Sequence, residues 1–474
     1  MDTGPRPSAP RLACRALPPE RFLLSGVHLF DPAHGVDLEG DVLVEGGMIA
    51  AAGDALKRPA GIEVVDGVKG CWVFPGFVDP HVHLRTPGFE YKEDVASGSR
   101  AAAAGGYVAV VAMANTEPVV DVGPVACWVL DQAARQASVR VGQVGAVSKG
   151  LKGEELAEMR ELADAGVVAF SDDGKPVSDA DLLLFALRYV RGTGRPLILH
   201  LENKSLAMDG VMHEGKWSAR LGLRGIPAAA ESASLARDLE IIRFVDAEDK
   251  RLTASAGTST GGAAAGAGRA PRVHFQHLSS AESVRLLRTA KAEGLPVTAE
   301  VTPHHLALTD ERLTSFDSNL KVNPPIRSAA DREALVSALA DGTIDCIGTD
   351  HAPHAPQEKE VPLEDALFGT TGLETAFAVL HTRLVLPGDL ALARLIEAMS
   401  AAPSHVFGLS EPSLVAGAVA DFCVADLSET WQVTPATLRG KSRNCAFLGE
   451  TLTGRVRMTV VDGARRFARA RGEA

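Results

Sequence analysis

Apolar runs recur through the middle of the chain, and each run ends in small or polar residues. Amphipathic stretches with helix start signals lie between several runs, for example residues 178–190, which begin at Ser178, and residues 279–294, where Ser279 and Glu282 fit a capping box. Near-continuous apolar strands that alternate with helices are typical of a parallel sheet covered by helices. Eight such runs predict an α/β fold with a (β/α)8 barrel, and they lie at residues 71–83, 107–115, 139–148, 167–174, 195–203, 272–279, 296–305 and 344–353.

Two segments with β-like patterns bracket this middle region. Residues 21–70 contain "FLLSGVHLF" and "GDVLVEGGMIAAAG", and residues 406–474 contain "VADFCVADL" and "VRMTVVDGARRF". We expect the two segments to form one small β-sandwich domain beside a barrel of residues 71–405. Residues 1–20 are rich in Pro and Arg and are expected to be a disordered N-terminal tail.

Residues 253–270 interrupt the alternation of strands and helices. The segment is rich in Gly and Ala and has no hydrophobic period, which predicts a flexible insertion. Because it precedes a strand, we expect it at the face of the barrel opposite the catalytic face.

Composition narrows the class of protein further. Hydrophobic residues make up 46% and charged residues 23%, which is typical of a soluble globular protein, and the net charge of −12 disfavours nucleic acid or an anionic membrane as a partner. The sequence shows no secretory signal and no apolar run long enough to span a membrane. The six cysteines lie far apart and are expected to be free thiols, so we predict a cytoplasmic protein.

Histidine and aspartate residues fall at the ends of the predicted strands. Catalytic groups of a parallel barrel lie at the carboxyl ends of its strands, so these side chains are expected to meet. Imidazole and carboxylate together form a ligand set that suits Zn²⁺. The His-x-His spacing alone is a weak signal, but the whole set predicts a metal site, and it comprises His81, His83, Asp172, Asp173, His200, His277 and Asp350.

Other histidines are assigned no metal. His274 lies three residues before His277, and strand alternation predicts that it points to the opposite side. His304 and His305 follow the seventh strand and are expected to be structural.

Several stretches together resemble one family, the class I dihydroorotases of the amidohydrolase superfamily. The resemblance runs from about residue 22 to the end of the chain. It implies a metal-dependent barrel with a β-sandwich made from both ends, in agreement with the pattern above. Among the matching stretches are "PGFVDPHVHLRTPG", "FSDDG", "HLENKSL", "QHLSSAESVRLLR", "KVNPPIRS", "DGTIDCIGTDHAPH" and "FGTTGLETAF".

The resemblance also implies roles for individual residues. His81 and His83 correspond to ligands of a first zinc ion, Asp173 to a carboxylate that bridges two zinc ions, and His200 and His277 to ligands of the second. Asp350 corresponds to a metal ligand that is also the catalytic acid and base. The implied substrate-binding residues are Arg85, Asn115 and His354 around the substrate carboxylate, Asn323, Phe368 and Gly369 around the ring, and in addition His83.

The activity implied is the reversible, zinc-dependent cyclisation of N-carbamoyl-L-aspartate to L-dihydroorotate, the third step of pyrimidine synthesis. A homodimer is expected, and aspartate transcarbamoylase is the protein partner that the family suggests. The alternatives are a dihydropyrimidinase, hydantoinase or allantoinase, or a non-catalytic homologue that serves as a scaffold for the transcarbamoylase. The first three typically bridge their metals with a carboxylated lysine, whereas this chain has Asp173 there and Lys175, expected to be exposed, two residues later.

Overall fold

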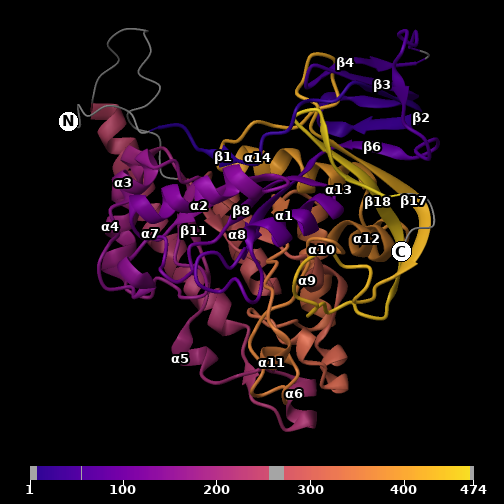
Figure 1. The fold of residues 1–474 in the computed structure, drawn as a ribbon. Helices are drawn as coiled ribbons and strands as arrows, with labels where there is room; N and C mark the ends of the chain where they lie inside the picture. Colours follow the sequence, from indigo (N-terminus) through magenta and orange to yellow (C-terminus); the bar gives the residue numbers. More distant parts are fainter. Residues whose placement is uncertain (1–7, 55, 256–271, 470–474) are drawn as a thin grey trace.

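The computed structural model of the protein describes residues 8–54, 56–255 and 272–469. A ring of helices surrounds a parallel sheet, and a second sheet lies to one side of it (Figure 1). The second sheet combines strands from both ends of the chain, drawn in indigo and yellow. Among the described residues, none of the helices combines the length and the apolar character needed to span a membrane.

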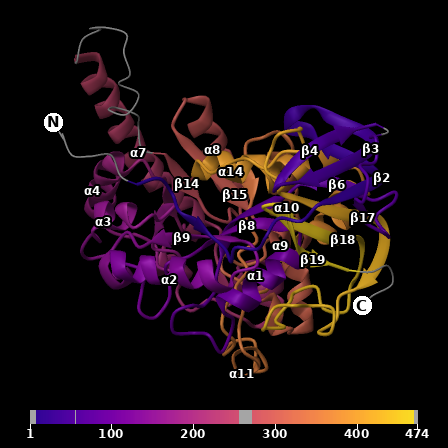
Figure 2. The ribbon, with the colours of Figure 1, turned by 45° about the horizontal axis from the view of Figure 1, so that its top comes forward.

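Eight parallel strands form the barrel, and each lies within one of the eight apolar runs. A parallel bridge between Val82 and His351, with a hydrogen bond of 2.9 Å from His83 N to His351 O, joins the first strand to the segment after the last strand, so the barrel is nearly closed. The (β/α)8 prediction is therefore confirmed (Figure 2). In their order around the barrel the strands are β7 (Phe77–Val82), β8 (Tyr107–Ala112), β9 (Arg140–Gly145), β10 (Ala169–Ser171), β11 (Leu197–Leu199), β14 (Val273–Phe275), β15 (Val297–Val301) and β16 (Cys346–Ile347).

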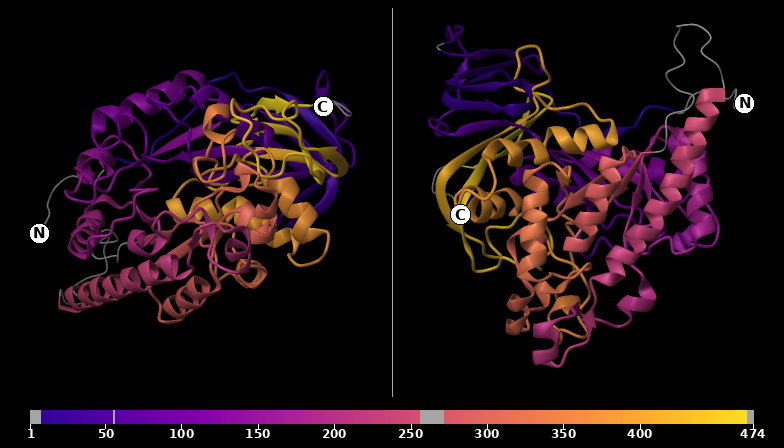
Figure 3. Two further views of the ribbon diagram at one scale, coloured as in Figure 1. Left: turned by 90° about the horizontal axis from the view of Figure 1, so that it is seen from below. Right: turned by 180° about the vertical axis from the view of Figure 1, so that it is seen from behind.

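Polar side chains cap several helices around the barrel, and two of these caps lie one residue later than predicted. Asp179 rather than Ser178 caps α4, and Ser280 rather than Ser279 caps α8 by accepting a hydrogen bond from Ser283 N. The long helix α7 runs down the outside of the barrel in the right view of Figure 3. The larger helices are α1 (Val95–Ala104), α2 (Gly123–Gln136), α3 (Met159–Asp164), α4 (Ala180–Val190), α7 (Ala229–Ser255), α8 (Ala281–Ala292), α10 (Ala329–Ala340), α12 (Ala376–Leu380), α13 (Leu392–Met399) and α14 (Ala401–Phe407).

Long segments after β11, β15 and β16 carry small elements at the carboxyl ends of the strands. In Figure 1, α5, α6 and α11 project together from the bottom of the molecule. These elements are α5 (Lys204–Ala207), β12 (Met212–His213), α6 (Lys216–Leu221), β13 (Gly225–Ile226), α9 (Pro303–Ala307) and α11 (Pro356–Lys359). Short helical turns lie at Pro32–His34, Lys149–Leu151, Arg191–Thr193, Asp310–Ser315, Ser318–Leu320 and His381–Val385.

The second sheet has the order β19–β18–β17–β6–β2–β3–β4, so its N-terminal and C-terminal strands meet where β6 pairs with β17. Strands from both ends of the chain therefore share one sheet, as the fold prediction requires. Its strands are β2 (Phe22–Asp31), β3 (Val36–Glu45), β4 (Met48–Gly53), β6 (Trp72–Pro75), β17 (Phe422–Gln432), β18 (Thr451–Val461) and β19 (Ala464–Ala468), and β5 (Glu63–Val64) pairs with β2.

The first apolar run, residues 71–83, contains two strands instead of one. It splits at Gly76 into β6 of the second sheet and β7 of the barrel. A Cβ atom at Gly76 would lie 2.2 Å from Val108 Cγ1, so only glycine fits where the chain passes between the two sheets. The barrel strands therefore start at Phe77 rather than at residue 71.

The N-terminal segment is ordered from residue 8 onward, which corrects the prediction of a disordered tail over residues 1–20. Leu12–Ala13 forms β1, which pairs antiparallel with β9, and Arg11 N donates to Gly166 O at 2.9 Å. A strand of two residues carries no readable period, which explains why the sequence pattern did not reveal it. Residues 1–7 lie outside the described residues.

The predicted insertion, residues 253–270, begins later than expected, because α7 continues to Ser255. The rest of it lies outside the described residues.

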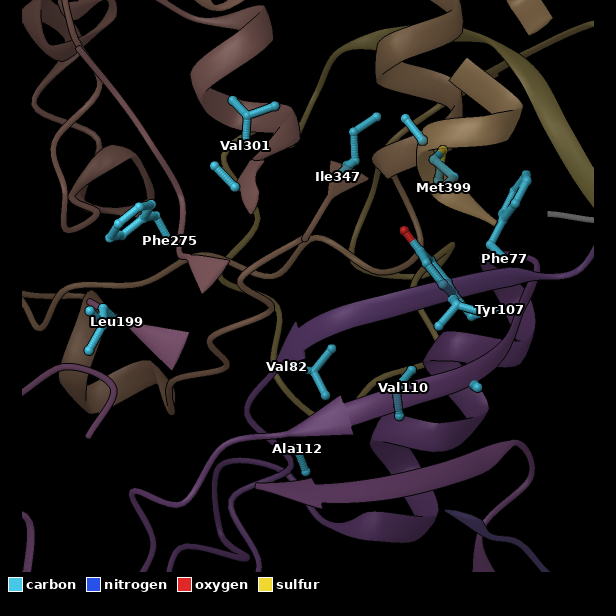
Figure 4. Packing of buried hydrophobic residues seen from close by; sticks show 14 of the residues in the cluster. Phe77, Val82, Tyr107, Val110, Ala112, Leu199, Phe275, Val301, Ile347 and Met399 are labelled. Atoms are coloured by element: carbon cyan, nitrogen blue, oxygen red, sulfur yellow. The ribbon is translucent and has the colours of Figure 1, made fainter. Parts of the chain in front are cut away.

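Apolar side chains fill the space between the barrel strands and the helices (Figure 4). Phe77, Val110 and Ile347 of three strands and Met399 of α13 are at most 1% exposed. Full burial of such a side chain contributes about 1.5–3 kcal/mol, so this packing fixes the strand ends on which the polar residues lie.

Candidate active site

The six predicted metal ligands lie together at the carboxyl ends of the barrel strands. His83 Nε2 lies 3.1 Å from Asp350 Oδ1, and His200 Nδ1 lies 2.9 Å from His277 Nε2. All six are buried or nearly so. They come from five strands or the residues directly after them: His81 and His83 (β7), Asp173 (β10), His200 (β11), His277 (β14) and Asp350 (β16).

Asp173 occupies the centre of this cluster. Its Oδ1 atom lies 3.4 Å from His81 Nε2, 3.8 Å from His200 Nδ1 and 3.9 Å from His277 Nε2, and its Oδ2 atom lies 3.5 Å from His83 Nε2. Burial raises the pKa of this carboxyl, but the surrounding imidazoles outweigh burial and hold the pKa well below its ordinary value. A central ionised carboxylate that reaches four imidazoles is placed to ligate a cation together with them.

The donor set fits a divalent metal ion. His200 Nε2 is buried and forms no hydrogen bond with any described residue. Burial, together with His200 and His81, lowers the pKa of His277 to about 3, so this imidazole is neutral, which is the ligand form of histidine. Four imidazoles and two carboxylates match the ligand preference of Zn²⁺.

Three of the site residues have left-handed backbone conformations. The φ angles are 58° at Arg85, 33° at His277 and 47° at Asp350. This region is uncommon for residues other than glycine, and such residues cluster at functional sites where the surrounding structure holds them. Side chains alternate between the two faces of a strand, and this alternation ends at these residues. Strand spacing therefore does not predict the direction of their side chains.

The position of His274 contradicts the prediction that its side chain points to the side opposite that of His277. It does not point away from the site, because its Nε2 atom lies 3.2 Å from Glu300 Oε2 and the other oxygen of Glu300 lies 2.7 Å from His81 Nδ1. β14 ends at Phe275, so the odd spacing between His274 and His277 does not separate them onto two sides.

Glu300 is the main site residue that the sequence analysis missed. It is 1% exposed, lies directly below the cluster and accepts hydrogen bonds from both His81 and His274. Burial raises its pKa, but the two histidines outweigh burial and lower the pKa to about 2. An acid that fixes the far nitrogen of a metal-ligating histidine orients the ring and raises its basicity. The only signal in the sequence was one acidic residue inside the apolar run 296–305.

A cavity of about 280 Å³ opens above the cluster. All seven predicted substrate-binding residues line it. One of them, His83, is also a predicted metal ligand, and four further predicted metal ligands line the cavity as well. Residues from both sets that line the cavity are His83, Arg85, Asn115, Asp173, His200, His277, Asn323, Asp350, His354, Phe368 and Gly369.

Polar contacts connect this lining to the cluster. Asn115 Oδ1 lies 3.0 Å from His83 Nδ1, and Asn115 Nδ2 donates to Asp173 Oδ2 at 3.1 Å. Arg85 Nε donates to Pro353 O at 3.2 Å, so the guanidinium lies beside His354. Asn323 Nδ2 donates to Glu202 Oε1 at 3.1 Å, and Glu202 is a second residue that the sequence analysis missed.

The remaining residues that the sequence analysis singled out differ in their contacts. Asp172 turns away from the cluster and accepts hydrogen bonds from Val147 N and Ser148 N. Lys175 is exposed, as predicted. His305 contacts Thr302 Oγ1 at 2.7 Å and Pro324 O at 2.9 Å, whereas His304 Nε2 is buried without a hydrogen bond to any described residue.

Solved structures with the same architecture include cyclic amidohydrolases, and the barrel with its second sheet has the fold of that class. L-Hydantoinase (dihydropyrimidinase) from Arthrobacter aurescens superposes with a TM-score of 0.77 at 25% identity, over 95% of this chain and 96% of that chain. The fold also matches dihydropyrimidinase from Brevibacillus agri, with a TM-score of 0.78 at 20% identity over 96% of each chain.

Sequence comparison narrows the class to one family. A profile described as "Dihydro-orotase-like" matches residues 70–245. The dihydroorotase of Citrifermentans bemidjiense is 45% identical over 93% of this chain and 98% of its own length. The dihydroorotase of Anaeromyxobacter dehalogenans is 47% identical over 93% of this chain and 96% of its own length. The chain belongs to the dihydroorotase family.

Proposed function

We propose that the protein is a dihydroorotase, which interconverts N-carbamoyl-L-aspartate and L-dihydroorotate by closing and opening a cyclic amide. The observation that carries the proposal is the single cavity that joins a cluster of four imidazoles and two carboxylates to the guanidinium of Arg85. The names and the identity of the full-length relatives support the same activity.

Two zinc ions are proposed, held by His81 and His83, by His200 and His277, and by the carboxylates of Asp173 and Asp350. Bound zinc supplies Lewis acidity at the scissile carbonyl and a water nucleophile that ionises near neutral pH. Asn115 supports the arrangement, because it contacts both His83 and Asp173.

Asp350 is the proposed acid and base. Burial raises the pKa of its carboxyl, but His81 and His83 outweigh burial and hold it below the ordinary value, so the group is ionised and can accept a proton. In ring opening, Asp350 takes the proton of the attacking water and delivers it to the ring nitrogen as the C–N bond breaks and the C–O bond forms. Ring closure reverses each transfer.

Arg85 is the proposed determinant of substrate choice. Dihydroorotate carries a carboxylate that dihydrouracil lacks, and a planar guanidinium can bind a carboxylate through two parallel hydrogen bonds. His354 and Asn115 line the same cavity and are proposed to share this group.

Hydantoinase or dihydropyrimidinase activity is the second candidate, because the structural neighbours carry these names. Against it stands Asp173 at the centre of the cluster, where these enzymes typically have a carboxylated lysine, and Lys175, two residues later, is exposed. All six proposed metal ligands are present, which disfavours a purely scaffolding role. The homodimer and the transcarbamoylase partner stay predictions of the family resemblance, and the cytoplasmic location stays a prediction from the sequence composition.

The test combines elemental analysis with assays on four substrates. The purified chain should bind zinc, with two ions per chain, and should open dihydroorotate while barely hydrolysing dihydrouracil, hydantoin or allantoin. Comparable rates on dihydrouracil and dihydroorotate would move the assignment to a dihydropyrimidinase. Full activity with one zinc ion per chain would overturn the two-metal proposal alone.

A further inference from the structure

Residues 367–369, here called the strap, form part of the cavity wall and follow α11. Side chains hold all three of the strap's backbone carbonyl oxygens. Lys359 Nζ donates to Leu367 O at 2.8 Å and to Gly369 O at 2.9 Å, and His354 Nε2 lies 2.9 Å from Phe368 O. Since Leu367, Phe368 and Gly369 all line the cavity, the position of the strap sets the shape of that wall.

Lys359 is an unusual lysine. It is 4% exposed, and its ammonium group contacts only backbone carbonyls, the third being Lys321 O at 3.5 Å. Among the described residues, no carboxylate lies within ion-pair distance of it. Lysine is rarely buried without an acidic partner, because a buried charge loses its hydration. Here three N–H donors meet three carbonyl acceptors, so the group is suited to fixing the backbone around it.

The rest of the strap's surroundings leave it little room to move. Leu367 N donates to Glu358 O at 3.1 Å, and Gly369 N donates to Lys321 O at 2.8 Å. Gly369 has a φ of 141°, and a Cβ atom there would lie 2.8 Å from Ala352 Cβ. The ammonium of Lys359 lies between these contacts and joins the two ends of the strap.

We propose that Lys359 is a positioning residue for substrate binding, which acts by holding the strap at the cavity wall through the carbonyls of Leu367 and Gly369. Lys359 does not line the cavity, so it acts through Phe368 and Gly369 and not by contact with the substrate. The inference rests on the proposed dihydroorotase function. It predicts that loss of the ammonium weakens substrate binding and leaves the metal cluster and the chemical step intact.

The charge of Lys359 offers a readout that a purely structural lysine would lack. Burial and the nearby Lys321 lower its pKa to about 7, whereas Asp317 and Glu358 act in the opposite direction. The ammonium is charged below that pH and neutral above it, and hydrogen bonds from a neutral amine are weaker than those from an ammonium. KM for dihydroorotate should therefore rise as the pH passes through about 7.

The experiment measures KM, kcat and zinc content from about pH 6 to about pH 8.5 for the zinc-loaded wild type, Lys359→Met and Lys359→Arg. Wild-type KM should rise several-fold across this range. Lys359→Met should raise KM roughly tenfold at the lowest pH and show no further step, since two charge-assisted hydrogen bonds are lost. Lys359→Arg stays protonated throughout, so its KM should also show no step. Zinc content should be unchanged, and kcat should change less than about twofold.

Lys291→Met is the matched control. Lys291 is partly buried and, like Lys359, donates to a backbone carbonyl, Gly342 O, but it also pairs with Asp345 Oδ2 and lies on α8. This variant should keep the wild-type KM and its pH step.

Three results would count against the inference. A flat wild-type KM, or a Lys359→Met variant with the wild-type KM at low pH, would overturn it while leaving the proposed function in place. If Lys359→Met lowers kcat and zinc content and raises KM, and if the wild-type KM does not change with pH, then Lys359 only stabilises the folded protein. An inactive wild type with bound zinc would overturn the proposed function itself.

Discussion

The strand residues that support the metal cluster, here called the floor, and the rim of the cavity are built from different parts of the fold. The floor comprises His81, His274, Gln276 and Glu300, whose side chains project from three barrel strands or from the residue directly after one and are at most 1% exposed. The rim comprises Arg85, His354 and the strap, which lie on segments after the strands, and Phe368 there is 36% exposed. Side chains bind one another in the floor, whereas in the rim side chains hold backbone carbonyls.

This difference separates two tasks. A floor made from paired strands has almost no freedom, which suits a metal site that needs fixed ligand directions. A rim made from loops can change its lining without disturbing the strands, which suits the choice of substrate. Floor variants should therefore alter metal binding or the chemical step, and rim variants should alter substrate binding and selectivity.

The largest effect is expected at Asp350, where the two tasks meet. Asp350→Asn keeps an oxygen that can bind metal but cannot move a proton, so kcat should fall about 10²–10⁴-fold. Zinc content, measured by elemental analysis, should stay close to that of the wild type. A near-normal kcat would show that Asp350 is a ligand only.

At the rim, Arg85→Met should reduce kcat/KM for dihydroorotate roughly 10- to 100-fold, because charge-assisted hydrogen bonds to the substrate carboxylate are lost. Zinc content should not change, and Arg85→Lys should give an intermediate loss, since lysine keeps the charge without the planar fork. The measurement compares dihydroorotate with dihydrouracil. An equal loss on both substrates would contradict a role in carboxylate recognition.

Within the floor, Glu300→Gln should lower zinc affinity about 10–100-fold, because the hydrogen bond that orients His81 weakens. Competition against a chelator measures this change, and at saturating zinc the KM should match that of the wild type. The control is Glu374→Gln, since this carboxylate accepts hydrogen bonds from the backbone N–H groups of Arg439 and Gly440 and not from a histidine. Equal zinc affinity in wild type and Glu300→Gln would show that Glu300 does not support metal binding.

The smallest effect on activity is expected where the barrel joins the second sheet. Arg140 of β9 donates to Asp421 Oδ2 at 2.6 Å and also pairs with Asp462, and both acids lie beside strands of the second sheet. Arg140→Met should cost about 1–3 kcal/mol of unfolding free energy and leave kcat/KM unchanged. Urea unfolding tests this, with Arg11→Met, which loses an exposed pair with Asp131, as a nearly silent control. A loss of activity in a folded Arg140→Met protein would show that the junction between the barrel and the second sheet also supports the active site.

The sequence pattern revealed the barrel and the residues of the metal cluster because both follow from local order. An apolar run predicts a strand, and the first polar residues after the run predict the end of that strand. His200 and Asp350 lie at such ends. Glu300 and Lys359 were not found, because their roles depend on partners that no local pattern indicates. Glu300 contacts His81, which lies 219 positions away. The splitting of the run 71–83 at Gly76 depends on the side chain of Val108, another distant contact.

The pairing of β6 with β17 has a consequence for the protein during its synthesis. The register places Pro75 opposite Phe422, so the ribosome synthesises β17, the partner strand of β6, roughly 350 residues after β6. At ribosomal rates this delay is on the order of 20–70 s, during which one edge of β6 is open. An unpaired edge is a template for pairing with another chain. Nascent or truncated chains that stop before β17 therefore present an aggregation-prone edge that the completed protein hides in the middle of its second sheet.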